Sequence, residues 1–136
     1  MRFWSSRSKS AEKSILIRQT LIDSILSYAR GVYPNEGILL LRGKIKRDTL
    51  MVEENIIPPF ATHGADFSSF PLFPLPMDAS IVGAAHSHPS GALRPSVQDL
   101  NNFYGRIMVI VVYPYRSSRD LAVFNRDGKK VSYQII

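Results

Sequence analysis

Two histidines and an aspartate stand at spacings that suit a metal site. His86 and His88 follow the apolar run 79–85, which is typical of a buried strand. Side chains two apart on a strand share a face, so both imidazoles are expected at the strand's C-terminal end. Pro89 ends this strand, and the helix expected shortly after it carries Asp99 in its first turn. Two nitrogens and one oxygen would leave a tetrahedral zinc ion one open position, as in catalytic rather than structural zinc sites.

The same residues also have an explanation without a metal. Ser96 and Asp99 match the S-x-x-D capping box, which accounts for both of them by helix initiation alone. Two histidines at a strand end can be no more than a polar rim. The joint pattern of two histidines at strand spacing, a strand-ending proline, and Ser and Asp at fixed offsets is harder to obtain from capping. The metal interpretation is therefore favoured.

With these positions the chain resembles the JAMM (MPN+) metallopeptidases. Their pattern is H-x-H-P, six residues, Ser, two residues and Asp, with a Glu far upstream, and the chain matches it throughout. The resemblance is closest to the small archaeal members and leaves out only the first fourteen residues. It implies one zinc ion per chain, with His86, His88 and Asp99 as the ligands. It also implies Glu36 as general base and Ser96 as the group that stabilises the oxyanion.

The resemblance further implies amide hydrolysis without a covalent intermediate. The substrate class it suggests is a ubiquitin-like protein or its conjugates, cut after the C-terminal tail, as desampylases and deubiquitinases do. The chain itself offers a means of holding an extended tail, since Phe67, Ser68, Ser69 and Phe70 are suited to a short exposed strand edge. A covering role over the core explains this segment equally well, and both interpretations stay open.

Glu36 also has an interpretation without a catalytic role, because a single glutamate after a helix is usually a solvated carboxylate. Its position at the mouth of an apolar, central strand argues against that. A neighbouring strand carrying His86 and His88, parallel or antiparallel, would bring the carboxylate to the metal site.

Composition limits the remaining choices. The chain has 136 residues, which suits one domain, and its 45% hydrophobic content is typical of globular proteins. It has no cysteine, which excludes disulfides, thiolate ligands and cysteine-peptidase chemistry. The N-terminus lacks an apolar signal-peptide core, so a cytoplasmic location is expected. The formal charge of +6 suits an acidic partner.

The predicted fold is α/β: a mixed, curved sheet between a long N-terminal helix and a second helix that bears the site. The resemblance implies the same MPN/JAMM, cytidine-deaminase-like architecture. Residues 1–14 are expected to be a flexible basic arm and residues 15–136 the metallopeptidase domain. The expected elements are a helix over 15–32, strands over 37–42 and 45–55 with a turn at 43–44, the strand before His86, a site helix to about 104, a strand over 106–113, and a hairpin of 121–124 with 130–135.

Two other functions would fit part of the sequence. A non-catalytic MPN scaffold would share the fold, but here every expected ligand is present. A basic nucleic-acid-binding domain would account for the charge, yet it leaves the histidines and Asp99 unexplained, and no such motif is found. We therefore expect neither nucleic acid nor membrane as a partner. The sequence leaves the oligomeric state open.

Overall fold

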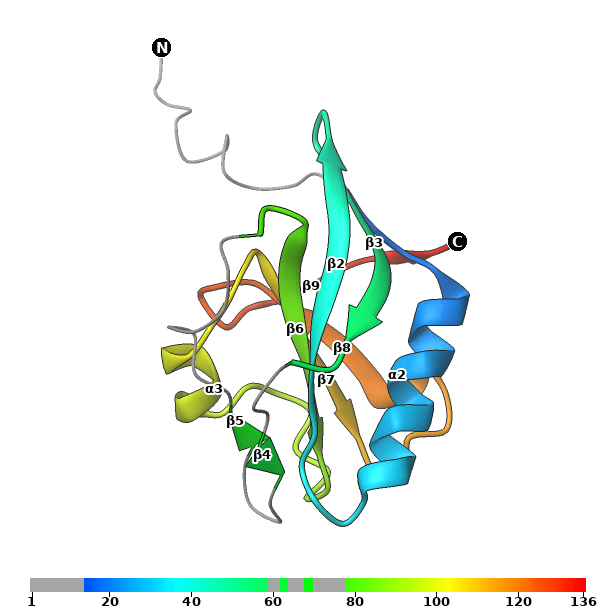
Figure 1. Cartoon of the computed structure of the whole chain (residues 1–136), viewed down its shortest axis with the longest axis vertical. Helices are drawn as coiled ribbons and strands as arrows, with labels where there is room; N and C mark the ends of the chain where they lie inside the picture. The colour runs from blue at the N-terminus through cyan, green and yellow to red at the C-terminus, as the bar shows by residue number, and fades with distance from the viewer. Residues whose placement is uncertain (1–13, 59–61, 64–67, 70–77) are drawn as a thin grey trace.

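A computed structural model describes residues 14–58, 62–63, 68–69 and 78–136 of the chain. Its main feature is an eight-stranded sheet with the order β10-β1-β3-β2-β6-β7-β8-β9. Figure 1 shows the sheet with one helix on each side. In chain order the elements are β1 (Ser14–Ile17), α2 (Gln19–Val32), β2 (Ile38–Lys46), β3 (Thr49–Ile56), β4 (Thr62–His63), β5 (Ser68–Ser69), β6 (Ile81–His88), α3 (Val97–Asn101), β7 (Ile107–Val112), η1 (Ser118–Asp120), β8 (Leu121–Phe124), β9 (Lys130–Val131) and β10 (Gln134–Ile135).

The predicted α/β class and mixed, curved sheet are confirmed. Strand β1 is parallel to β3 and β10, and β6 is parallel to β7, while the other pairs of the large sheet are antiparallel. Strands β9 and β10 are consecutive in the chain but lie at opposite ends of the sheet order, so the sheet curls until its two edges approach one another.

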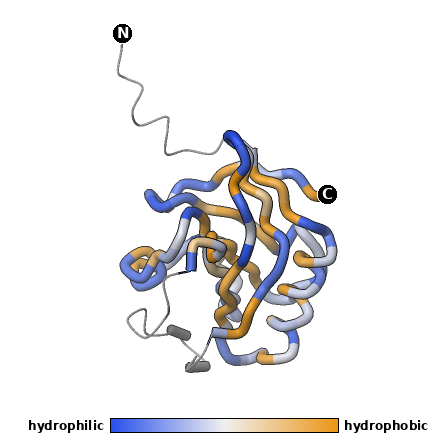
Figure 2. The backbone as a smooth tube through the Cα atoms, turned by 45° about the horizontal axis from the view of Figure 1, so that its top comes forward, coloured by the Kyte–Doolittle hydropathy of each residue, from blue (hydrophilic) through white to orange (hydrophobic). Residues whose placement is uncertain are grey.

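Two apolar cores lie on the two faces of the sheet. Helix α2 buries its apolar stripe in the larger core, as its 3.6-residue period predicts. The smaller core lies on the α3 side, between Phe103 and the facing side chains of β7 and β8. Figure 2 shows the central strands as the most hydrophobic part of the backbone, with hydrophilic residues at the turns.

Strand β6 lies in the middle of the sheet and carries both histidines. It pairs antiparallel with β2 and parallel with β7. Its small residues let these neighbours approach closely: a Cβ on Gly83 would lie 2.2 Å from the Ile107 carbonyl oxygen. The register sets His86 beside Ile110 and His88 beside Val112, whose side chains belong to the smaller core. Both histidines therefore face the α3 side.

The prediction of a helix beginning at Ile15 was wrong. Residues 14–17 form β1, where Ile15 and Ile17 are buried and Ser14 is exposed. This is the two-residue alternation of a strand, and α2 begins only at Gln19, after the extended Arg18. The N-terminal arm lies outside the described residues, except that Ser14 already belongs to β1.

The predicted turn at Gly43 and Lys44 was also wrong. Strand β2 continues through both residues to Lys46, and the chain reverses at Arg47, which has a φ of 58°. Gly43 marks a register shift against β3, where a Cβ would lie 2.0 Å from the Met51 carbonyl oxygen. A bulge, and not a turn, requires this glycine.

Two elements in the second half differ from the expectation. The site helix ends at Asn101 and not near 104, because the chain turns so that Phe103 enters the smaller core. The second arm of the predicted hairpin is split. Strand β9 pairs with β8 as expected, whereas β10 crosses to pair with β1, since the curled sheet brings that edge within reach.

The segment proposed to hold the substrate is partly described. Ser68 and Ser69 form β5, which pairs antiparallel with β4 in a separate two-stranded sheet. The prediction of a short strand is confirmed for these two residues, and Phe67 and Phe70 lie outside the described residues. Within the part of the chain that is described, no helix combines the length and the apolar character needed to cross a lipid bilayer.

Candidate metal centre and catalytic cleft

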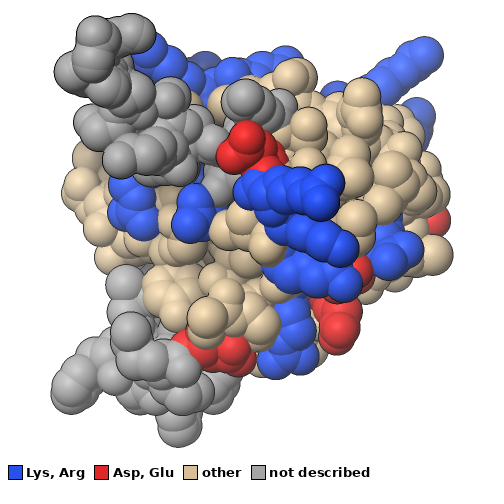
Figure 3. Space-filling model, turned by 90° about the horizontal axis from the view of Figure 1, so that it is seen from above, with Lys and Arg blue, Asp and Glu red and all other residues tan. Residues whose placement is uncertain are grey.

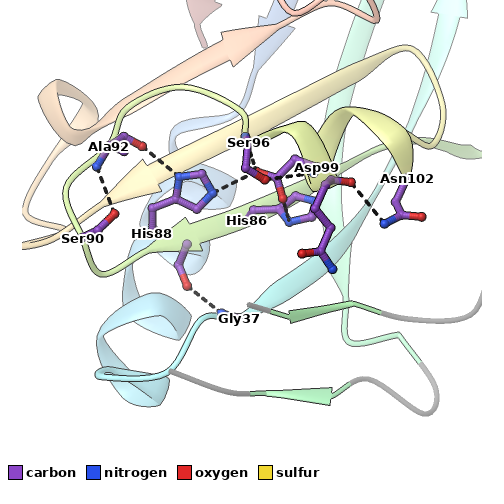
Figure 4. A network of polar contacts seen from close by, with 10 residues as sticks. Gly37, His86, His88, Ser90, Ala92, Ser96, Asp99 and Asn102 are labelled. Carbon is purple, nitrogen blue, oxygen red and sulfur yellow. Dashed lines mark hydrogen bonds and ion pairs between the residues drawn. The ribbon is translucent and has the colours of Figure 1, made fainter. Parts of the chain in front are cut away.

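Three predicted ligands meet where β6 ends and α3 begins. His86 and His88 come from β6 and Asp99 from the first turn of α3. His88 Nε2 lies 3.0 Å from Asp99 Oδ2, and His86 Nδ1 lies 3.4 Å from Asp99 Oδ1. All three residues are at most 6% exposed. Figure 4 shows both imidazoles turned toward the Asp99 carboxylate.

Asp99 belongs both to the capping box of α3 and to the group that it forms with the two histidines. Ser96 caps α3: its hydroxyl accepts from the Asp99 N–H at 3.0 Å, and its own N–H donates to Asp99 Oδ2 at 2.9 Å. Capping thus fixes the Asp99 side chain, and the fixed side chain faces the histidines. The simpler explanation from helix initiation is correct and is also the means by which the carboxylate is aimed.

His88 is held from both sides. Its Nδ1 lies 2.8 Å from the Ala92 carbonyl oxygen, which can only accept, so Nδ1 carries a hydrogen and Nε2 faces Asp99. The loop that supplies Ala92 is tied back by the Gly91 N–H, which donates to the His88 carbonyl. An outer hydrogen bond of this kind orients a histidine that binds a metal through its other nitrogen.

Burial and mutual charge separate the protonation states of the three groups. Burial lowers the pKa of His86 to about 4, against the attraction of Asp99. Burial also opposes charge on His88, but its hydrogen bond to Asp99 and that to Ala92 raise its pKa overall. Although burial alone would raise the pKa of Asp99, His88 and its other partners lower it to about 2. Near neutral pH the carboxylate is ionised and His86 is a neutral imidazole.

Glu36 is brought to the site by the pairing of β2 with β6. Ile38 lies opposite His86, and because this pair is antiparallel, the same register places Glu36 opposite His88. A cleft of about 440 Å³ is lined by Glu36 together with His88, Ser96 and Asp99. The structure thus brings together all five residues predicted for metal binding and catalysis. The antiparallel alternative, left open by the sequence, is the one observed.

The residues present fit a zinc ion by their chemistry. Two imidazoles and one carboxylate form a donor set that zinc uses, and the buried Nδ1 of His86 has no hydrogen-bond partner among the described residues. As the side chains stand, no group of three His, Asp or Glu in the described ranges could hold a metal ion. In the structure Asp99 Oδ2 contacts His88 Nε2 at 3.0 Å and accepts a hydrogen bond from the Ser96 N–H at 2.9 Å.

One residue of the site was overlooked in the sequence. Ser87 stands between the two histidines, is 3% exposed, and accepts a hydrogen bond from the Gly37 N–H at 2.7 Å. No local pattern in the sequence marks Ser87, because its hydrogen-bond partner Gly37 is distant in the chain.

Comparisons with known proteins identify the family and the fold. The family model of the prokaryotic homologues of the JAB domain, Prok-JAB, matches residues 18–133. The chain belongs to this family. The resemblance to the JAMM proteins is thereby confirmed. A curated relative from Haloferax volcanii, described as a probable metalloprotease, is 33% identical over 115 residues, which cover 79% of this chain and 71% of the relative.

Two solved structures are similar over most of the chain. A JAB1/MPN domain protein from Archaeoglobus fulgidus is 31% identical, with a TM-score of 0.67, and the match covers 90% of this chain and 98% of that protein. A structure described as JAMM, a metalloprotease-like zinc site in the proteasome and signalosome, is 28% identical, with a TM-score of 0.62. That match covers 90% of this chain and 97% of the other. The Prok-JAB chain therefore shares its fold with proteins of the JAB1/MPN and JAMM type.

Proposed function

We propose that this Prok-JAB protein is a zinc-dependent metallopeptidase that hydrolyses the amide bond after the C-terminal tail of a ubiquitin-like protein. The observation that carries the proposal is the contact of His86 and His88 with Asp99, beside a cleft that His88 and Asp99 line together with Glu36. The family membership and the metalloprotease-like descriptions of the relatives support it.

Each side chain has a role that follows from its position. His86, His88 and Asp99 would hold the metal, which when bound supplies Lewis-acid polarisation of a carbonyl and activation of water. Glu36 accepts the proton of the attacking water and afterwards gives a proton to the departing amine. The Ser96 hydroxyl already accepts from the Asp99 N–H, so its own hydrogen is free to be donated into the cleft that it lines, toward the developing oxyanion.

Three considerations support the proposed substrate class. The β4–β5 ribbon is a small sheet to which an extended tail can add as a further strand, with backbone hydrogen bonds setting its register. Residues without side chains suit a backbone that must approach a metal closely, which favours a tail ending in Gly-Gly. The charge of +6 suits an acidic modifier. We therefore propose one zinc ion per chain and a ubiquitin-like conjugate as substrate.

The decisive test is Glu36→Gln, with cleavage of an isopeptide-linked ubiquitin-like protein as the assay. The amide keeps the shape of the side chain but takes up no proton, so the rate should fall by about a hundredfold or more. Zinc content, measured by elemental analysis, should stay at the parent level. Glu54→Gln, an exposed glutamate on β3, is the matched control. Turnover of Glu36→Gln at the parent rate would show that the base lies elsewhere.

A further inference from the structure

Gly37, the residue after Glu36, is hydrogen-bonded to β6 differently from a regular antiparallel pair. In a regular antiparallel pair, two opposite residues exchange both of their N–H to carbonyl hydrogen bonds. Here Ser87 N–H donates to the Gly37 carbonyl at 3.1 Å, but the return bond from the Gly37 N–H goes to the Ser87 hydroxyl at 2.7 Å. A side chain thus takes the place of a carbonyl, in a buried position, at the residue that follows Glu36.

Ser87 acts from the face of the sheet opposite to the ligands. Its neighbour across the ladder is Val111, which belongs to the larger core, whereas His86 and His88 face the smaller one. The Ser87 hydroxyl therefore binds the backbone next to Glu36 from the face of the larger core. The Glu36 carboxylate lines the cleft on the other face. Figure 4 shows this bond to Gly37 below the two histidines, apart from the hydrogen bonds of Asp99.

The surroundings of Ser87 are packed closely enough to hold it in place. Tyr115, which is 0% exposed, lies beside it and is fixed by Arg30, whose guanidinium donates to the Tyr115 carbonyl. Burial raises the pKa of the Tyr115 phenol to about 12, against a smaller opposite effect of the Ser87 hydroxyl. The phenol oxygen makes no well-formed hydrogen bond within the described residues, but it lies close enough to the Ser87 hydroxyl to affect the phenol's pKa, so the two side chains are neighbours in the core.

Gly37 has no room to move on the other side. A Cβ at this residue would lie 2.6 Å from Tyr28 Cε2 and 3.0 Å from Val32 Cγ2, both on α2. The backbone after Glu36 is therefore confined between α2 and the Ser87 hydroxyl.

We propose that Ser87 is a positioning residue, which sets the direction of the Glu36 carboxylate through the Gly37 N–H. The inference rests on the proposed role of Glu36 as base. A base must lie within hydrogen-bond reach of the water it deprotonates, and a displacement of about 1 Å can cost about a hundredfold in rate. The metal ligands do not depend on this bond, because His86 and His88 are held by β7 and the loop at Ala92.

The test is a double-mutant cycle on the full chain, with Ser87→Ala, Glu36→Gln and the double variant. Ser87→Ala should lower kcat by about tenfold to a hundredfold and leave KM and zinc content near the parent values. In the Glu36→Gln background, Ser87→Ala should cause no further loss, because both changes act through one carboxylate. Ser87→Thr keeps the hydroxyl and should restore most of the rate.

Each contrary result has a distinct meaning. Parent activity of Ser87→Ala, with Glu36→Gln inactive, would overturn the positioning role and leave the proposed function standing. An equal loss in both backgrounds, or loss of zinc in Ser87→Ala, would overturn it as well, since Ser87 would then act through other groups. Thermal unfolding shows whether Ser87→Ala is folded. If it is not, Ser87→Cys takes its place in the cycle, because a thiol of similar size is a weak hydrogen-bond acceptor and should also lower kcat. Parent activity of Glu36→Gln would instead reject Glu36 as the base, which is the part of the proposed function on which this inference rests.

Discussion

His86 combines deep burial with a pKa of about 4, well below the 6.5 of a free histidine. In the metal-free protein the unfolded chain therefore binds a proton at His86 below pH 6.5, whereas the folded chain does so only near pH 4. Stability must fall as the pH drops through this interval, by about 3 kcal/mol for a shift of this size. Chemical denaturation of chelator-treated protein between pH 7 and 4 measures it. His86→Gln should flatten the dependence, and an unchanged slope would contradict the assignment.

The ligand assignment predicts the metal content of single variants. The parent should carry close to one zinc ion per chain, whereas His88→Ala and Asp99→Ala should lose it, because each leaves only two donors. Elemental analysis after exhaustive dialysis decides between the outcomes. His88 and Asp99 share one hydrogen bond, so each variant also leaves a buried partner unpaired. A full zinc complement in both variants would mean that the metal is bound elsewhere.

Helix α3 begins at Ser96, which caps it and which the proposed mechanism also uses. Ser96→Ala removes the cap and should cost about 1 kcal/mol of stability, whereas Ser96→Gly should cost only a few tenths. Both variants lack the hydroxyl that is proposed to donate into the cleft. If that hydroxyl stabilises the oxyanion, both should be slowed to a similar extent despite their different stabilities. Cleavage rates and thermal unfolding of both variants are the measurements. A rate loss confined to Ser96→Ala would assign Ser96 to capping alone.

The elements that the sequence predicted well are those with a strong local pattern. The apolar stripe of α2 and the apolar run of β6, which ends at a proline, are strong local signals, so both elements were identified correctly, although α2 begins later than predicted. Ile15 and Ile17 were drawn into the helix because three residues cannot distinguish a strand from a first helical turn. Gly43 suggested a turn because a bulge needs the same residue type.

The site was predictable in its members but not in its assembly. The spacing of His86, His88 and Asp99 is local and visible in the sequence. The approach of Glu36 depends on which strands pair and in what register, and these are set by the whole sheet. The role of Ser87 was hidden for the same reason, because its partner Gly37 is distant in the chain.

At the scale of the whole molecule, charge and the β4–β5 ribbon together predict a substrate preference. Figure 3 shows Lys and Arg side chains gathered in a band on one face of the protein, with Asp and Glu side chains directly beside several of them. Fusions ending in Gly-Gly should be cleaved faster than fusions ending in Leu-Leu, and the rate with an acidic modifier should fall as salt screens the attraction. Cleavage assays at low and high ionic strength measure both effects. Equal rates for the two endings would reject a groove for glycine tails, and rates independent of salt would exclude the basic face from substrate capture.

The pairing of β1 with β10 is the seam at which the curled sheet closes, and it has a consequence for the order of folding. Strand β10 meets β1 through Leu16 opposite Gln134 and Ile17 opposite Ile135, so this pair joins segments from the two ends of the described chain. The entropy lost in closing a loop grows with its length, and two-residue strands return few hydrogen bonds for it. The β2–β3 hairpin and the β6–β7 pair, whose partners are closer in the chain, should therefore form first. The cleft between β6 and α3 would then be complete before the seam closes, and opening of the seam would leave His86, His88 and Asp99 in place.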